Sequence, residues 1–225
     1  MESIKTLIFT RFKILSLLTI SMALSIVLLM IRMKMHQSFY LLFLVWNLFL
    51  AIIPYAITIG LISTPKTNKL VFVIWFSIWL LFLPNAPYIV TDLLHLINSK
   101  SHLMWLDILV ILSFAFNGLI LFFLSLSDME KHIKQYVPSR YIFPLMLSIF
   151  GLTAFGIYLG RFLRYNSWEI INEPLQIFSD IFRIILEPNT EAWIFTLTFA
   201  SFLAISYWML KAFTIPKIDL ADDKK

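Results

Sequence analysis

Long apolar runs alternate with short polar segments along the chain. Each run approaches the length of about 20 residues that a helix needs to cross a bilayer, and Lys or Arg residues stand near most of the run ends. Runs of this length with few charges are typical of membrane-spanning helices. The pattern therefore predicts six spans, at residues 14–31, 39–62, 70–96, 103–127, 141–160 and 193–213.

The third run is interrupted by Pro84 and Pro87 and then resumes with polar residues. Proline has no amide hydrogen and disfavours a helical residue before it, so the span is predicted to break near Leu83. We expect Asn85 to cap a second helix, with Pro87 in its first turn, where a missing amide costs little. Spacings of three, four and three residues then place one polar stripe on that helix, formed by Asn85, Tyr88, Asp92 and His95.

A second polar stretch follows the fifth span. Arg161 and Arg164 stand three residues apart, which predicts a shared helix face. Asn166 followed by Glu169 has the form of a capping box that opens another helix. Apolar residues recur at helical spacing over 168–186, so we expect an amphipathic helix lying in the outer membrane interface there.

The composition excludes most other classes of protein. Of the 225 residues 60% are hydrophobic and 14% are charged, which indicates an integral membrane protein. Continuous apolar runs do not fit the alternating strands of a membrane barrel, so the predicted fold class is an all-α bundle, one domain over residues 1–225. The absence of cysteine removes disulfides and thiolate chemistry. Most basic residues flank the spans, so the net charge of +5 predicts no nucleic-acid partner.

The distribution of Lys and Arg predicts the orientation. Six spans place both termini on one side of the membrane, and twelve Lys and Arg residues fall on that side against six on the other. Because basic residues favour the cytoplasmic side, both termini are predicted to be cytoplasmic. The stretches 85–95 and 161–169 then share the outer side, where they can form one site.

The residue types in these two stretches suggest an anion-binding site. Guanidinium groups make forked bonds to phosphate, so Arg161 and Arg164 are candidates for binding an anionic lipid or phosphorylated carrier. Asp92 and His95 are candidates for catalytic proton transfer. The structural alternative is an ion pair of an arginine with Asp92, or snorkelling of the arginines to lipid headgroups. Four further residues complete the predicted substrate-binding group: Asn85, Tyr88, Asn166 and Glu169.

A metal site is the alternative chemistry for the same residues. Asp92 and His95 would be two ligands, completed by Asp107, His102 or Glu169. Structural zinc sites usually need more histidine or cysteine ligands than this chain offers, since it has four histidines and no cysteine. We therefore predict no metal site. No phosphate-binding glycine loop or dinucleotide motif occurs, and no cofactor is assigned.

Three segments together resemble a family of bacterial membrane proteins. They are LPNAPYIVTDLLHL at 83–96, FAFNG at 114–118 and GRFLRYNSW at 160–168. The combination is similar to the family called domain of unknown function 1361, and the similarity extends from the second span to the sixth. The resemblance implies a multi-pass protein of a bacterial cytoplasmic membrane and assigns no activity.

Three functions remain open from the sequence. The first is binding or processing of a phosphorylated lipid or carrier at the outer face. The second is a transporter or ion pathway, for which Asn47 and Asn117 within the spans are the best support. The third is a non-catalytic subunit of a membrane assembly that docks through residues 168–186. The sequence does not decide whether the chain is an enzyme, and it names no protein partner.

Overall fold

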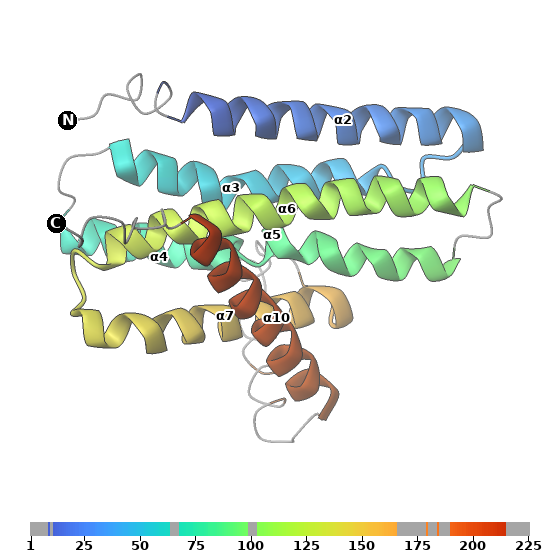
Figure 1. The fold of residues 1–225 in the computed structure, drawn as a ribbon. Coiled ribbons are helices and arrows are strands. Elements are labelled where there is room, and N and C mark those ends of the chain that lie inside the picture. Colours follow the sequence, from blue (N-terminus) through green and yellow to red (C-terminus); the bar gives the residue numbers. More distant parts are fainter. Residues whose placement is uncertain are drawn as a thin grey trace, which may run out of the picture.

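The protein is an all-α bundle with the chain running back and forth between two ends (Figure 1). The computed structural model describes residue 9, residues 11–63, 68–98, 103–165, residues 179 and 184, and residues 190–214. Its elements are α2 (Phe12–His36), α3 (Phe43–Ser63), α4 (Lys69–Phe82), α5 (Asn85–Tyr88), the 3₁₀ helix η1 (Ile89–Asn98), α6 (Met104–Ile133), α7 (Ser139–Phe162) and α10 (Thr190–Thr214).

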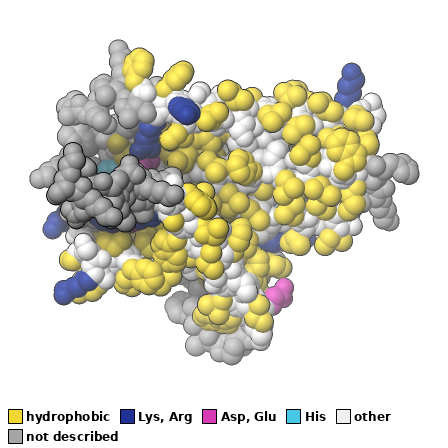
Figure 2. Space-filling model, viewed as in Figure 1, with side chains coloured by type: hydrophobic (Ala, Val, Ile, Leu, Met, Phe, Trp, Pro, Cys, Tyr) yellow, Lys and Arg dark blue, Asp and Glu magenta, His cyan; other side chains and the backbone are white. Residues whose placement is uncertain are grey.

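Six spans are confirmed within these described residues. Six helical segments are long and apolar enough to cross a membrane: Phe12–His36, Phe43–Ser63, Lys69–Ile97, Met104–Ile133, Ser139–Phe162 and Thr190–Phe213. We call the end of the bundle where α2 begins and α10 ends the terminal end, and the other the opposite end. Figure 2 shows hydrophobic side chains over much of one face, with most of the visible Lys and Arg side chains toward the terminal end.

Helix α6 is the centre of the bundle. In an apolar stretch of 18 residues of α6, 56% of the residues are buried, compared with 17% in the corresponding stretches of α2 and α10. Aromatic side chains fill the core around it, and Trp79 of α4 is fully buried and donates from its indole nitrogen to Ser125 Oγ of α6 at 2.8 Å. A buried indole N–H needs such a partner, so this bond fixes α4 against α6.

The fourth span was predicted to end at residue 127, which is too early for the helix that forms it. Helix α6 continues to Ile133, and Asp128 and Glu130 are buried on it. Arg11 donates to both carboxylate oxygens of Asp128, and Lys134 and Lys211 donate to Glu130. Partners from α10 and from the start of α2 thus allow acidic residues to remain in a buried helix. The hydrogen bonds to Asp128 also raise the pKa of the Arg11 guanidinium, which therefore stays charged.

Helix α10 is inclined to the other helices and crosses α7 (Figure 1). Near its C-terminal end Lys211 reaches Glu130 of α6, so this end of α10 lies beside α6. The amphipathic helix predicted over 168–186 precedes α10 and lies outside the described residues, residues 179 and 184 excepted.

Candidate functional site

The break in the third span occurs where the prolines predict it. Helix α4 ends at Phe82, and Leu83 and Pro84 form a turn before α5. The N-cap of α5 is Pro84, so the prediction that Asn85 caps a second helix is wrong. The Asn85 amide instead donates to the Phe82 carbonyl at 2.9 Å. In a continuous helix the Ala86 amide would donate to the Phe82 carbonyl, but here it donates to Leu83, and the Asn85 side chain supplies Phe82 with a partner.

Two glycines allow the broken segment to lie close to α6 and α7. A Cβ on Gly118 of α6 would overlap the Ala86 carbonyl oxygen, and a Cβ on Gly156 of α7 would stand 2.7 Å from Pro84 Cγ. A Cβ at such separations would force the neighbouring backbone or proline ring to shift, so both positions favour glycine. This close packing places η1 next to the C-terminal end of α7.

Asp92 is the buried centre of the site. Its side chain is 1% exposed, and Arg161 of α7 forms an ion pair with Oδ1. Asn47 of α3 donates to Oδ2 at 2.9 Å. Both carboxylate oxygens therefore have partners from other helices, which offsets the cost of burying the charge.

Arg161 contacts several polar residues of the broken span. Its Nε donates to Thr91 Oγ1 at 2.9 Å, Nη1 lies 3.2 Å from His95 Nε2, and Nη2 reaches Asp92. The guanidinium carbon lies 4.5 Å from the centroid of the Tyr88 ring, a cation–π contact. Tyr88, Asp92 and His95 thus meet around one arginine, as their spacing on the predicted stripe suggested.

The contacts of His95 define its protonation. An arginine can only donate, so His95 Nε2 must accept the hydrogen bond from Arg161. The ring proton then lies on Nδ1, which is 3.1 Å from the Tyr40 hydroxyl. The His95 side chain is 31% exposed, against 12% for Arg161. His95 is therefore the neutral, accessible member of the cluster.

Arg164 does not share a helix face with Arg161, contrary to prediction. Helix α7 ends at Phe162, and Arg164 follows in the left-handed conformation with φ of 62°. A residue in this conformation commonly ends a helix and turns the chain away. Arg164 is exposed, three residues beyond the buried cluster. Asn166 and Glu169 lie outside the described residues, so their predicted roles remain predictions.

A second buried ion pair lies at the same end of the bundle. Arg32 of α2 donates from Nε to Asp107 of α6 at 2.7 Å and from Nη1 to the Ser38 carbonyl at 3.0 Å. The Arg32 and Asp107 side chains are 6% and 3% exposed. Asp107 thus belongs to a different cluster from Asp92. Among the described residues no three His, Asp or Glu side chains gather as a metal site would require.

Sequence reasoning missed three members of the site. Asn47 was considered only as support for a transport pathway, and Tyr40 and Thr91 were not singled out. Tyr40 and Asn47 lie 55 and 45 residues from their partners, so no local spacing identifies them. Thr91 is adjacent to Asp92, and its hydroxyl donates to the Tyr88 carbonyl at 2.7 Å, which orients its oxygen toward Arg161.

The comparisons with known proteins identify the family and no activity. No curated protein and no solved structure matches the chain. One family model matches residues 46–206, which covers more than half of the chain and includes α4 to α7 with the whole Arg161 cluster except Tyr40. The chain therefore belongs to the family described as protein of unknown function DUF1361.

Proposed function

We propose that this protein binds the phosphate headgroup of a lipid or lipid-linked carrier at the opposite end of the bundle. We further propose that it lies in a bacterial cytoplasmic membrane with both termini in the cytoplasm, so that the site faces outward. The excess of Lys and Arg on the side of the termini supports this orientation. Arg164, with its side chain exposed at the end of α7, would then stand at the outer surface.

The observation that carries the proposal is an arginine that is fixed in place and only partly used. Arg161 has five N–H donors, and within the part of the chain that the structure describes its contacts with Thr91, Asp92 and His95 use one hydrogen on each nitrogen, which leaves one on each Nη. A phosphate oxygen can accept both in a forked arrangement. The Arg161 side chain is 12% exposed and already held by these contacts, so little further side-chain entropy is lost on binding.

The position along the bundle fits a headgroup. The third span from Lys69 to Ile97 follows a path of about 45 to 50 Å at the rises of α and 3₁₀ helices, longer than a hydrocarbon core of about 30 Å. Asp92 lies about 12 Å before the end of η1 at about 2 Å per residue. These lengths are compatible with a cluster near the level of the phosphates, with η1 continuing outward.

Asp92 and His95 would have different roles in this site. Both oxygens of Asp92 are occupied by Arg161 and Asn47, so Asp92 is a positioning residue that holds the arginine. His95 is accessible and presents a neutral imidazole beside the guanidinium. We therefore assign any proton transfer with the bound amphiphile to His95.

Native mass spectrometry of gently extracted protein tests the proposal. The wild type should retain a phosphate-bearing lipid, and the variant Asp92→Asn with Arg161→Gln should lose it. This variant removes both charges together, so no lone charge is left buried. The matched control is Arg32→Gln with Asp107→Asn, which neutralises the second pair at the same end and should keep the lipid. Equal retention in all three proteins would contradict the proposal.

Two milder substitutions keep the test decisive if the paired variant does not fold. Arg164→Ala and His95→Gln alter exposed or half-buried side chains, so neither removes a buried charge. Each should reduce retention of the lipid in proportion to its contact with the headgroup. Unchanged retention in both would exclude the outer face of the cluster as the binding surface.

The transport alternative gains no support from the two asparagines on which it depended. Asn117 donates to Ser25 Oγ at 3.0 Å and to the Ser113 carbonyl, and the bond to Ser25 joins α6 to α2. Asn47 joins α3 to η1. Polar residues commonly connect spans in this way. The docking surface of the subunit alternative, residues 168–186, lies outside the described residues apart from positions 179 and 184.

A further inference from the structure

His95 presents one ring nitrogen to Arg161 and the other to Tyr40. Nε2 lies 3.2 Å from Arg161 Nη1 and accepts its hydrogen, while the proton on Nδ1 faces the Tyr40 hydroxyl at 3.1 Å. The Phe43 ring packs against the imidazole with centroids 4.8 Å apart. These contacts hold the ring with the lone pair of Nε2 directed at the guanidinium. A neutral nitrogen held in this way can take a proton, which is what a general base requires.

A phosphate bound by Arg161 would lie next to this base. Nη1 is the atom that donates to His95, and within the described residues the second hydrogen of Nη1 remains for a phosphate oxygen. The phosphate and Nε2 would then be neighbours around one nitrogen of the guanidinium. A general base acts at hydrogen-bond distance, and a water molecule between His95 and the phosphorus satisfies that requirement.

Proton uptake by His95 would strengthen the hold on the phosphate. An imidazolium has no lone pair for Arg161, so the Nη1 hydrogen becomes available to the phosphate as the base takes its proton. His95 Nε2 also lies 3.9 Å from Oδ1 of Asp92, whose carboxylate stabilises the new charge. Interactions that form only as charge develops lower the barrier of a reaction. The cluster is therefore suited to catalysis as well as to binding.

The same cluster limits the leaving group. Both oxygens of Asp92 accept hydrogen bonds, and the Thr91 hydroxyl already donates to a backbone carbonyl. Tyr40 lies at the other nitrogen of the His95 ring. Among the described residues with a polar contact to Arg161 or His95, none therefore offers a proton on the side of Nε2. An alkoxide would need such a proton to leave, whereas a phosphate group leaves as a stable anion.

We propose that this site hydrolyses a lipid diphosphate, with His95 as the general base and Arg161 binding the terminal phosphate. Nε2 takes a proton from water as the water oxygen bonds to the terminal phosphorus. The bond from this phosphorus to the bridging oxygen breaks, and its electron pair stays on the lipid monophosphate. The proton on His95 then passes to the solvent, and inorganic phosphate is released. This inference rests on the binding of a phosphate headgroup proposed above.

Phosphate release from two matched lipids tests the proposal. The full-length protein in detergent micelles is incubated with farnesyl diphosphate or with farnesyl monophosphate, and inorganic phosphate is measured. The diphosphate should yield inorganic phosphate and farnesyl monophosphate, and the monophosphate should yield no phosphate. In water labelled with oxygen-18 the label should appear in the inorganic phosphate and not in the lipid, because water attacks the terminal phosphorus.

The pH dependence and one variant identify the base. The charged or titratable groups that face His95 from the described elements are Asp92 of η1, Arg161 of α7 and Tyr40 before α3. The rate at saturating diphosphate should rise with pH to a plateau, because only the neutral imidazole accepts a proton. His95→Gln should lower this rate by about 100-fold or more and remove its rise with pH.

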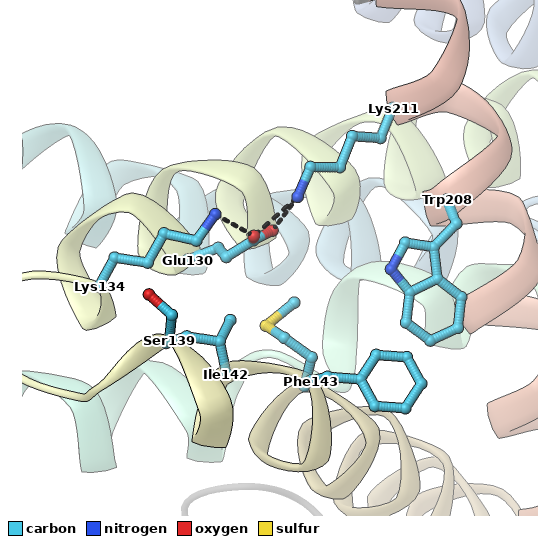
Figure 3. A pocket seen from close by; sticks show the side chains of 8 residues that line it. Glu130, Lys134, Ser139, Ile142, Phe143, Trp208 and Lys211 are labelled. Atoms are coloured by element: carbon cyan, nitrogen blue, oxygen red, sulfur yellow. Dashed lines mark hydrogen bonds and ion pairs between the residues drawn. The ribbon is translucent and has the colours of Figure 1, made fainter.

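The terminal end of the bundle provides the matched control. A cavity of about 400 Å³ lies there between α6, α7 and α10, and Lys134 and Lys211 pair with Glu130 at its wall (Figure 3). None of the described side chains that line it is a histidine. A diphosphate attracted to these lysines would meet no imidazole base. Lys134→Gln should therefore leave the rate and its pH dependence unchanged.

The outcomes separate this inference from the binding on which it rests. Farnesyl diphosphate that is retained in native mass spectra but releases no phosphate would overturn the hydrolysis and leave the binding intact. Failure to retain it would contradict the binding itself. Equal release from the monophosphate, or label in the lipid, would overturn the assignment to the terminal phosphate of a diphosphate. An unchanged rate in His95→Gln, or an equal loss in Lys134→Gln, would exclude His95 as the base.

Discussion

Two buried ion pairs at one end of the bundle differ in what surrounds them. The Arg32 and Asp107 side chains are 6% and 3% exposed, and the arginine also donates to the Ser38 backbone carbonyl. Asp107 also lies in the first turn of α6, where the helix dipole favours a negative charge. This pair joins α2 to α6 and is closed to ligands.

Arg161 and Asp92 are buried to a similar degree but remain connected to the surface. His95 contacts the guanidinium and is 31% exposed. Asp92 lies on a 3₁₀ helix after a proline break rather than on a regular α-helix. A buried charge pair in a membrane protein therefore does not by itself indicate a site. The accessible titratable neighbour and the irregular backbone distinguish the candidate site from a structural pair.

The largest expected effect is the loss of one charge from either pair. Arg32→Leu removes the cationic partner of the buried Asp107 carboxylate, which should lower the free energy of unfolding by about 3–5 kcal/mol. Arg161→Leu should cost less, because Asn47 still donates to Asp92 and the cluster is partly open. Unfolding in mixed micelles of dodecyl maltoside and dodecyl sulfate measures both variants. A larger cost for Arg161→Leu would contradict the distinction between a closed and an open pair.

A smaller effect is expected from filling the close approach of α5 to α6. Gly118→Ala places a Cβ against the Ala86 carbonyl oxygen, and overpacking of this kind costs about 1–3 kcal/mol. Hydrogen exchange should rise in η1, which α5 positions, and remain unchanged around Arg32. Gly60→Ala is the matched control, since nothing lies within 4 Å of its Cβ and alanine favours a helix by about 1 kcal/mol. Equal exchange in η1 for both variants would show that the glycine does not position the site.

The fold was largely predictable because membrane spans are determined by local properties. Length and hydropathy sufficed for six spans, and Pro84 predicted the break in the third. The end of α6 was placed too early, at residue 127, because the charges of Asp128 and Glu130 suggested that the span ends before them. Their burial depends on Arg11, Lys211 and Tyr207, whose proximity only the packed bundle reveals.

The candidate site was predictable only in part, for the same reason. Tyr88, Asp92 and His95 share a stripe that the spacing predicts, and the topology placed Arg161 at the same end. The pairing of Arg32 with Asp107 joins residues 75 apart in sequence, and no pattern specifies it. The turn of the chain at Arg164 was also not predicted, because an arginine rather than a glycine occupies this left-handed position after α7.

The smallest expected effect concerns the hydrogen bond between the Tyr40 hydroxyl and His95 in the Arg161 cluster. Tyr40→Phe removes a partner of a half-buried imidazole and should cost about 1 kcal/mol or less. Nitrogen-15 NMR of labelled histidine should show the proton on Nδ1 of His95 in the wild type, because Arg161 can only donate to Nε2. In Tyr40→Phe this signal should shift, while Tyr141→Phe at the terminal end should leave it unchanged. A proton on Nε2 in the wild type would mean that Arg161 does not donate to His95. The Arg161 cluster would then lack the contact with an accessible histidine by which it differs from the Arg32–Asp107 pair.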